Sequence, residues 1–386
     1  MHDMPTSFYR GLIRSVGLLF IFCLFTSCNA SSKQEVAQKP DGDTSLPSAT
    51  LPPLNGTFSP ELQKKFEEKL KSGNFHGNAV IFNSKGEYFS FSEGFADSGK
   101  ELRNDTSTLF QIASVTKHIT ARAIIDLVKE NKLSLSDPVS KHLKQKFPYG
   151  NIRIKDLLDQ TSGLPDFTEL KIPTALAGKG PDNNEIISAY VTGNPKLKFT
   201  PGTRYDYVNI NYIILASIVE NISGLKYEQY VREKLFGAAG TANVYQNSEM
   251  SKIDAPSAVG YQSVISKYIP VSKGATAIFE NRKGSGGLWT SAEALTKWYR
   301  YLFFRNDEYY NYLTQYKPNS PSFLLGWYPA GSGKTGYFYN HGAFPGFAAW
   351  TGYIPETRTV VLLLENYSGN AKTTGEQLVK VLLNDK

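Results

Sequence analysis

The chain has 386 residues, of which 41% are hydrophobic, and its formal net charge is +7. This length and composition can bury a large core and favour one large domain or two coupled lobes. Lysine-rich stretches such as KKFEEKLK are interleaved with glutamate, which indicates a solvated surface and excludes a basic nucleic-acid-binding stripe.

Cysteine and histidine usage argues against metal and thiol chemistry. The two cysteines, Cys23 and Cys28, both lie near the N-terminus, and the five histidines show no metal-ligand spacing. We therefore expect no metal or other cofactor, no disulfide and no cysteine nucleophile.

Residues 1–27 have the pattern of an export signal. Two arginines precede an apolar run at 17–25, which is too short to remain as a membrane-spanning helix. The small residues after this run lead directly into Cys28, which resembles a bacterial lipobox, although Phe25 stands where that pattern usually has leucine. The resemblance implies a lipid on Cys28 and a protein anchored to the membrane on the periplasmic or cell-surface side of the bacterial envelope. An ordinary signal peptide followed by a chance cysteine is the alternative.

A tether and then a folded domain are expected after the signal. Residues 28–58 are polar and rich in Ser, Pro and Gly, which is typical of a disordered linker. The domain is expected over 59–386. Its first segment, SPELQKKFEEKLKS, predicts a capped amphipathic helix with Pro60 in the first turn and one apolar stripe, formed by Leu62, Phe66 and Leu70.

Strand patterns at both ends of the domain enclose helical patterns. NAVIFNSKGEYFSFSEGF alternates around a turn at 84–86 and predicts a β-hairpin, whereas helical patterns dominate from about 114 to 240. The C-terminal third returns to strands in FLLGWYP, YFYNHGAF, FAAWTGYIP and TVVLLLEN, before a final helix in TGEQLVKVLLND. We predict a three-layer α+β fold, in which an antiparallel sheet built from both chain ends carries helices on both faces and a mostly helical lobe, about 120–280, is inserted.

Ser114 and Lys117 form the first candidate chemical pair. They begin the helical pattern SVTKHITARAIIDLVKENKL, and the i, i+3 spacing places the hydroxyl and the amine on one face. The helix dipole favours a developing negative charge at this end, and burial disfavours the charged form of a lysine. A neutral Lys117 can then act as the base for Ser114. The pattern S-x-x-K alone also fits an N-cap serine followed by an exposed lysine.

The surrounding stretch, DTSTLFQIASVTKHITARAIIDLVKENKLSLSDPVSKHL, resembles the nucleophile segment of the serine beta-lactamase and penicillin-recognising DD-peptidase superfamily. It is most similar to the branch that holds class C beta-lactamases, DD-carboxypeptidases and related esterases. Three similar blocks follow in the family's order, at 152–167 (ending in TSGLPDF), 201–231 and 284–298, although Ala294 replaces the usual aspartate. The resemblance covers roughly residues 60–380.

The resemblance implies roles for Tyr207 and Asn209, which match the family's Y-x-N triplet. A phenol beside a neutral or proton-sharing lysine can relay a proton to the leaving group. Asn209 can hydrogen-bond both the lysine and a substrate amide. Tyr207 is one of 23 tyrosines, so packing under a loop is the alternative role. Asn211 is interpreted as structural.

Two tripeptides compete for the family's third motif, which is K-T-G or H-x-G on a strand beside the serine. Counting back from PGF and YIP, the ungapped position is Asn340-His341-Gly342. Lys334-Thr335-Gly336 lies instead in AGSGKTG, which has the composition of a hairpin turn. It also lacks the first glycine and the strand-to-helix junction of a phosphate loop. We therefore place this K-T-G outside the active site.

Asn340 departs from the family pattern, which has Lys or His at this position. Because side chains alternate along a strand, His341 is expected to face away from Asn340. Either a one-residue bulge turns His341 into the site, or Asn340 works there as a neutral donor, and we favour the second. Gly342 would let the substrate approach the backbone, and the amide of Ala343 would pair with that of Ser114 as the oxyanion hole.

The sequence thus predicts a serine hydrolase that forms an acyl-enzyme on Ser114. The family resemblance implies that its substrate is an ester, a beta-lactam or a peptide-like amide such as a peptidoglycan fragment. The absence of Lys or His at position 340 favours an esterase or carboxypeptidase over an efficient beta-lactamase. A catalytically weak peptidoglycan-binding or sensor module is the main alternative, and nucleotide binding through GSGKTG is a further one.

Overall fold

The computed structural model describes residues 51–170, 180–264, 267–272, 281–305, 308–367 and 369–385. The expected signal sequence, the lipid site at Cys28 and most of the expected tether lie outside these residues and stay predictions. Among the residues that are described, no helix is long and apolar enough to cross a bilayer.

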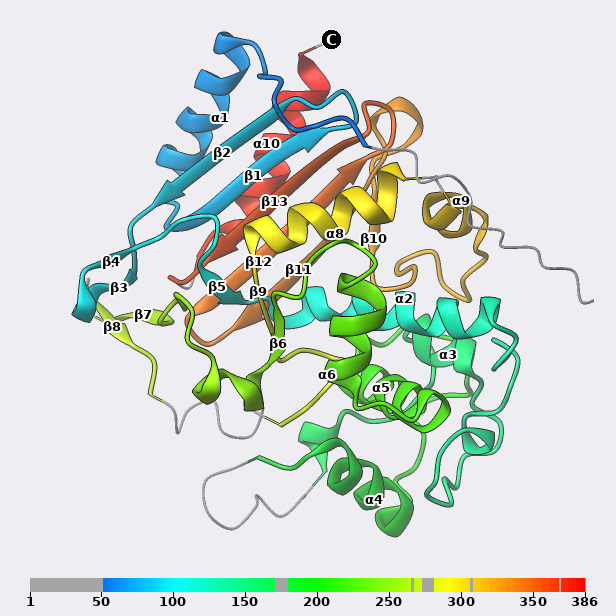
Figure 1. The fold of residues 1–386 in the computed structure, drawn as a ribbon. Coiled ribbons are helices and arrows are strands. Elements are labelled where there is room, and N and C mark those ends of the chain that lie inside the picture. The colour runs from blue at the N-terminus through cyan, green and yellow to red at the C-terminus, as the bar shows by residue number, and fades with distance from the viewer. Residues whose placement is uncertain are drawn as a thin grey trace, which may run out of the picture. The chain divides into compact units, whose positions relative to one another are not determined.

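A six-stranded antiparallel sheet organises the domain, with strand order β10-β11-β12-β13-β1-β2 (Figure 1). Two strands come from the N-terminal part of the domain and four from its C-terminal part: β1 (Gly77–Asn83), β2 (Tyr88–Glu93), β10 (Tyr328–Ala330), β11 (Tyr337–Phe344), β12 (Phe347–Ile354) and β13 (Thr359–Glu365). The two groups join where β1 pairs with β13, from Gly77 opposite Glu365 to Asn83 opposite Thr359. The predicted antiparallel sheet built from both chain ends is confirmed.

Helices cover both faces of this sheet. The helices α1 (Pro60–Ser72) and α10 (Ala371–Asn384) pack on one face, and α8 (Ala292–Phe304) packs on the other (Figure 1). The helix α1 begins after Ser59, whose side chain accepts a hydrogen bond from the Leu62 amide, and it buries the predicted apolar stripe. Because both faces are covered, β13 is buried along its whole length. The three-layer α+β architecture is confirmed.

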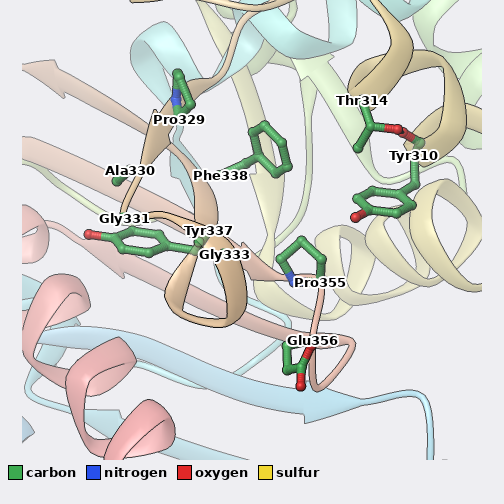
Figure 2. A pocket seen from close by; sticks show the side chains of 11 residues that line it. Tyr310, Thr314, Pro329, Ala330, Gly331, Gly333, Tyr337, Phe338, Pro355 and Glu356 are labelled. Atoms are coloured by element: carbon green, nitrogen blue, oxygen red, sulfur yellow. The ribbon is translucent and has the colours of Figure 1, made fainter.

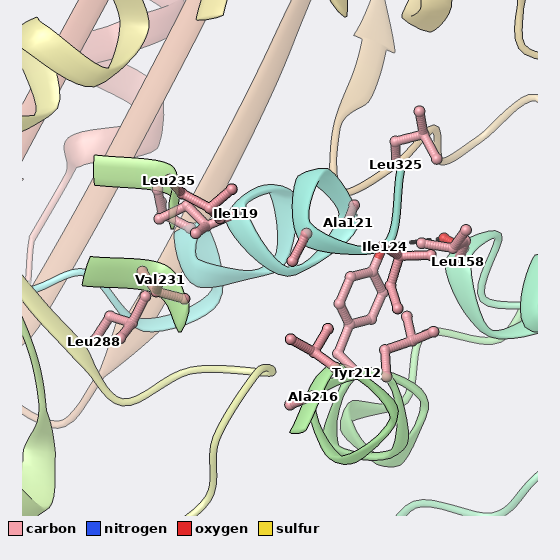
Figure 3. Packing of buried hydrophobic residues seen from close by; sticks show 14 of the residues in the cluster. Ile119, Ala121, Ile124, Leu158, Tyr212, Ala216, Val231, Leu235, Leu288 and Leu325 are labelled. Carbon is pink, nitrogen blue, oxygen red and sulfur yellow. Dashed lines mark hydrogen bonds between the residues drawn. The ribbon is translucent and has the colours of Figure 1, made fainter. Parts of the chain in front are cut away.

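The remaining helices form a lobe around α2 (Thr116–Lys129), which is buried at every position from Thr116 to Ile125. Figure 3 shows Ile119 and Ile124 of α2 among apolar side chains of the neighbouring helices. Of the lobe helices, α5 (Asn209–Ser223) and the π-helical turn Val231–Phe236 pack on α2, and α3 (Ile154–Leu158), α4 (Asn183–Gly193) and α6 (Tyr227–Tyr230) pack on α5. The helix α9 (Glu308–Gln315) follows α8 later in the chain. The start of α2 is thus held rigidly inside the core.

Three small sheets complete the described domain. They are formed by β3 (Phe95–Asp97) with β4 (Leu102–Arg103), by β5 (Leu109–Gln111), β9 (Leu288–Ser291) and β6 (Val244–Gln246), and by β7 (Tyr261–Val264) with β8 (Lys267–Pro270). The central strand β9 pairs with β5, which leads directly into the segment that carries Ser114.

The strand predicted for FLLGWYP is wrong over most of its length. Only Tyr328 and the residues after it join the sheet, because the chain turns at Leu325 and Gly326, with φ of 49° and 90°. A β-carbon on Gly326 would lie 2.5 Å from the backbone nitrogen of His118. The turn therefore packs directly against α2, which an extended strand with side chains would prevent.

Candidate active site

Ser114 lies in a short 3-10 turn, Ala113–Val115, between β5 and α2. The preceding residue, Ala113, has a φ of 44°, a left-handed conformation that is uncommon for residues other than glycine. Strand β11 approaches this turn closely, because a β-carbon on Gly342 would lie 2.7 Å from the Ser114 nitrogen and 2.5 Å from the Ile112 carbonyl oxygen. Strained backbone of this kind persists only where the surrounding structure enforces it, and it clusters at functional sites.

The amine of Lys117 is held between three oxygen atoms. Its Nζ atom lies 3.1 Å from Ser114 Oγ and donates hydrogen bonds to Asn209 Oδ1 at 3.0 Å and to the Ser285 carbonyl oxygen at 2.7 Å. A neutral amine has two N–H bonds and one lone pair. Since the contacting atoms, Asn209 Oδ1 and the Ser285 carbonyl oxygen, can only accept, they take the two N–H groups of a neutral amine, and its lone pair is left for the hydroxyl proton of Ser114.

Burial and charge together favour the neutral form of this amine. Burial is the largest cause that lowers the pKa of Lys117 well below its usual value, and the positive charge of Arg282 lowers it further. The negative charge of Asp166 acts in the opposite direction. A lysine whose pKa is lowered in this way is more easily deprotonated, and its neutral amine can act as a base.

Tyr207 contacts both members of the pair. Lys117 Nζ lies 4.8 Å from the centre of the Tyr207 ring, and the phenol hydrogen-bonds with the Ser114 hydroxyl. Burial raises the pKa of Tyr207, and the hydrogen bond with Ser114 partly offsets this effect. The phenol is therefore protonated at neutral pH and can hand a proton on.

A buried hydrogen-bond network holds the segment that carries Tyr207 and Asn209. The Asn209 amide donates to Asp166, and the Asn211 side chain donates to Gln160 at 2.6 Å and accepts from the Ser162 hydroxyl at 2.6 Å. Asn211 is fully buried, as expected for a structural residue. The TSGLPDF block therefore supports the Y-x-N segment by direct contact.

On the strand side of the site, β11 runs in unbroken register with β12, with Asn340 opposite Thr351 and His341 opposite Trp350. The alternative of a β-bulge at this point is therefore wrong. Asn340 is 2% exposed, and its side-chain amide donates to the carbonyl of Gly326.

His341 is half-buried, and its ring stacks on Tyr328 with the ring centres 5.5 Å apart. Burial is the largest cause that lowers its pKa, followed by the positive charges of Lys372 and of Lys117 when that amine is protonated. The imidazole is therefore neutral at neutral pH and lies within electrostatic reach of Lys117. Of the other two predicted strand residues, Gly342 is buried and Ala343 is exposed.

The literal K-T-G at 334–336 lies away from this constellation. It belongs to an exposed turn, Gly333–Thr335, in the hairpin between β10 and β11, which confirms the predicted turn. Figure 2 shows the pocket beside it, of about 470 Å³, which is lined by side chains that include Tyr310 of α9 and Pro355. Ser114 does not line this pocket. A turn between two strands also fails the strand-to-helix requirement of a phosphate loop.

Sequence reasoning missed two features near the site. Arg282, which is 7% exposed, precedes the GSGG block, and a single arginine beside glycines carries no recognisable motif. The second feature is a cavity of about 530 Å³ with Gln111, Asn247, Trp289 and Phe344 in its lining. Gln111 is three residues before Ser114, and Phe344 follows Ala343, although Ser114 does not itself line this cavity.

No group of three or more His, Cys, Asp or Glu side chains in the described part of the chain is placed to hold a metal ion. The groups that meet around Ser114 are instead an amine, a phenol and a carboxamide, on Lys117, Tyr207 and Asn209. This arrangement fits nucleophilic catalysis by a serine with a lysine as its base.

Comparison with known proteins identifies the family. The sequence model of the family described as Beta-lactamase matches residues 62–383. The putative penicillin-binding protein PbpX of Bacillus subtilis is 30% identical over 381 residues, covering 92% of this chain and 90% of that protein. A penicillin-binding protein from Bacillus halodurans has a similar fold, with a TM-score of 0.70 and 24% identity over 82% of this chain and 98% of that one.

The D-amino acid amidase from Ochrobactrum anthropi SV3 also shares the fold, with a TM-score of 0.66 and 18% identity over 84% of this chain and 98% of that one. The family match spans nearly the whole described domain and includes Ser114, Lys117, Tyr207 and Asn209. The chain therefore belongs to the beta-lactamase family of serine hydrolases.

Proposed function

We propose that this protein hydrolyses esters or peptide-like amides through an acyl-enzyme on Ser114. The observation that carries the proposal is the placement of the Lys117 amine, which lies 3.1 Å from Ser114 Oγ and has its two N–H groups directed to other acceptors. The lone pair of a neutral Lys117 is thus aimed at the hydroxyl that has to lose a proton.

The reaction then follows in balanced steps. Ser114 Oγ forms a bond to the substrate carbonyl carbon while its proton moves to Lys117, and the carbonyl oxygen becomes an oxyanion held by the amides of Ser114 and Ala343. As the bond to the leaving group breaks, Tyr207 gives its proton to that group and recovers one from Lys117. Water then attacks the carbonyl carbon of the acyl-enzyme. One proton of this water returns through Lys117 and Tyr207 to Ser114 Oγ as the bond between that oxygen and the acyl group breaks, which frees Ser114 and the acid product.

The cavity of about 530 Å³ beside the site supports a neutral acyl group. Its lining combines apolar rings with neutral amides and hydroxyls, and the described side chains that line it carry no charge. The Trp289 indole donates to Asn247 at 2.8 Å, which fixes one aromatic surface of this cavity. An acyl donor with an uncharged, partly aromatic or amide-bearing side chain fits this lining.

The strand side supports an esterase or carboxypeptidase over an efficient beta-lactamase. Asn340 brings no positive charge where the family has Lys or His, and its amide is bonded to Gly326. A substrate carboxylate would therefore meet a weaker anchor beside Tyr207. The name of the relative PbpX is compatible with a penicillin-reactive serine here, since covalent capture of a beta-lactam needs acylation but no rapid deacylation.

We further propose that the domain works at the cell envelope, anchored by a lipid on Cys28. The lipobox-like sequence before Cys28 supports this location. Replacing Cys28 with alanine should move the expressed protein from the membrane fraction to the soluble fraction of the cells. A protein that stays in the membrane fraction after the substitution would exclude this anchor.

The acyl-enzyme is tested by labelling the purified domain with a fluorescent penicillin and with a fluorophosphonate. Intact-mass measurement should show one adduct per chain, and the Ser114→Ala variant should show none. Turnover of p-nitrophenyl esters and of D-alanyl-D-alanine peptides by the wild-type protein then ranks the two substrate classes. Fast cephalosporin turnover would overturn the preference against a beta-lactamase.

A catalytically weak peptidoglycan-binding or sensor module is the second candidate. The observation that favours it is Asn340, which stands where we expect the family's cation and whose side-chain amide donates to the Gly326 carbonyl. If neither probe labels the wild-type domain while it still sediments with purified peptidoglycan, the binding module is correct and the hydrolase is excluded.

A further inference from the structure

Arg282 lies against the two segments that build the catalytic pair. A β-carbon on Gly286 would lie 3.5 Å from Arg282 Nη2, 3.6 Å from its Nε and 3.7 Å from the carbonyl carbon of Ala113. The guanidinium is therefore packed beside Gly286, in the turn that bears Ser285, the acceptor for Lys117, and the backbone of Ala113 approaches the same glycine. Its backbone is fixed as well, because Gln246 Nε2 donates to the Arg282 carbonyl oxygen at 3.0 Å.

The charge of this buried guanidinium reaches the reacting groups. Burial is the largest cause that lowers the pKa of Arg282, to about 10, and the negative charges of Asp166 and of an ionised Tyr207 raise it. Arg282 thus stays protonated at neutral pH. Its charge lowers the pKa of Lys117 and that of Tyr207.

Other groups also face the Lys117 amine. The hydroxyl of Ser114 and the ring of Tyr207 contact it, and the Tyr212 ring centre lies 5.9 Å from Nζ. Asp166 contributes a negative charge, and His341 of β11 is near but neutral. Among the described residues, Arg282 and Asp166 are therefore the two charges that act on the amine, and they act in opposite directions.

We propose that Arg282 is a positioning residue that supplies the fixed positive charge of the site and keeps Lys117 in the state of a neutral base. The inference rests on the proposed acyl-enzyme function. It places the cation on the segment before the GSGG turn, although the family pattern places a cation on the strand at position 340. Arg282 acts through Lys117 and does not itself need to contact the substrate.

The expected pH effects have definite signs. Loss of a neighbouring positive charge raises the pKa of Lys117, so a higher pH is needed to form the neutral base. We call the pH at which the acylation rate falls to half of its maximum on the acid side the acid limb of the profile. In Arg282→Met this pH should rise by about one unit, and the acylation rate at lower pH should be about tenfold lower than in the wild type. Arg282→Lys keeps the charge and should stay near wild type, whereas Asp166→Asn should move the limb down.

The test is the rate of Ser114 labelling by a fluorophosphonate, measured from pH 5 to pH 10 for these variants. Lys234→Met, which removes a positive charge from an exposed position in the same lobe, is the matched control and should leave the profile unchanged. Melting temperatures check that each variant is folded. If Arg282→Met does not fold, Arg282→Lys and Asp166→Asn still test the sign.

The outcomes separate this inference from the proposed function. The inference is supported if the pH of the acid limb is higher in Arg282→Met, lower in Asp166→Asn and unchanged in Arg282→Lys. A uniform loss of rate with an unmoved limb, or equal shifts in Arg282→Met and Arg282→Lys, assigns Arg282 a packing role only and overturns it. If the wild-type protein is not labelled at any pH, the acyl-enzyme proposal itself fails.

Discussion

The two sides of the site keep the family's residues to different degrees. On the helical side, Lys117 contacts Ser114, Asn209 and Ser285, and each of these contacts comes from a different segment. On the strand side, β11 keeps its register with β12 and has a glycine at 342, but Asn340, at the position where we expect the family's cation, is bonded to Gly326.

The difference follows from what each side has to do. The helical side has to hold a neutral amine against a hydroxyl, and a buried polar group with a lost partner is costly, so each residue there depends on the others. In the proposed mechanism the strand side positions the substrate mainly through its backbone, which at Gly342 lies close to Ser114. Side chains on a strand can change without altering the hydrogen-bond ladder. The following experiments test whether activity depends on the two sides in this unequal way.

The largest effect is expected for Lys117→Met. Removing the base should lower kcat/KM for ester hydrolysis by on the order of 1,000-fold. The melting temperature should stay the same or rise, because methionine fills the space without burying an amine. Activity within tenfold of wild type would show that the base lies elsewhere and would remove the central distinction between the two sides.

Gly342→Ala should have the next largest effect. Its β-carbon would lie 2.7 Å from the Ser114 nitrogen, so the strand or the nucleophile has to shift. A displacement of this kind should cost about 100-fold in kcat/KM and about 1 to 3 kcal/mol in the free energy of unfolding. Gly150→Ala is the matched control, since a β-carbon there meets nothing within 4 Å. Equal effects at both positions would contradict a specific contact at 342.

Asn340→Ala and His341→Ala should affect activity less than either of these substitutions. Loss of the hydrogen bond to Gly326 should lower the free energy of unfolding by about 1 to 3 kcal/mol in Asn340→Ala, with less than about a tenfold change in kcat. His341→Ala should raise KM by a few-fold, about 1 kcal/mol of binding free energy, with little change in kcat. If either variant lost as much kcat as Lys117→Met, the side chains of the strand side would be as important for catalysis as those of the helical side, which would contradict the comparison.

A pH dependence of stability that leaves the chemistry unaffected is expected from the sheet. Burial raises the pKa of Glu365, at the end of β13, from its usual 4.5 to about 8. The folded protein therefore keeps this proton at pH values where the unfolded chain has lost it. The resulting contribution to the free energy of unfolding is fully present below about pH 4.5 and is lost as the pH rises through about 8.

Glu365→Gln should remove this dependence, which is on the order of a few kcal/mol, without moving the pH profile of Ser114 labelling. Urea unfolding at pH 5, 7 and 9 measures the change. A Glu365→Gln variant that loses stability with pH as steeply as wild type would show that another group titrates.

The parts of the site that could be predicted from the sequence are those built from neighbouring residues. Ser114 and Lys117 share one turn of helix, and Tyr207 and Asn209 share one helix entry, so spacing and family blocks place each pair. Arg282 and the Ala113 segment both approach Gly286 only because the chain folds back at the GSGG turn, and no local pattern encodes that approach. The turn at Gly326 was missed for the same reason, since its close contact with His118 depends on tertiary packing that overrides strand propensity.

The pairing of β1 with β13 has a consequence for how this protein acquires its structure. Asn83 and Thr359 are neighbours in the sheet, yet nearly the whole domain is synthesised between them. The loop that this pairing closes is long, so the first hairpin has to wait for the last strands before it gains its partner. A ribosome that stalls before residue 359 would release a chain with a completed nucleophile segment but an open sheet edge, and such a fragment is prone to aggregate.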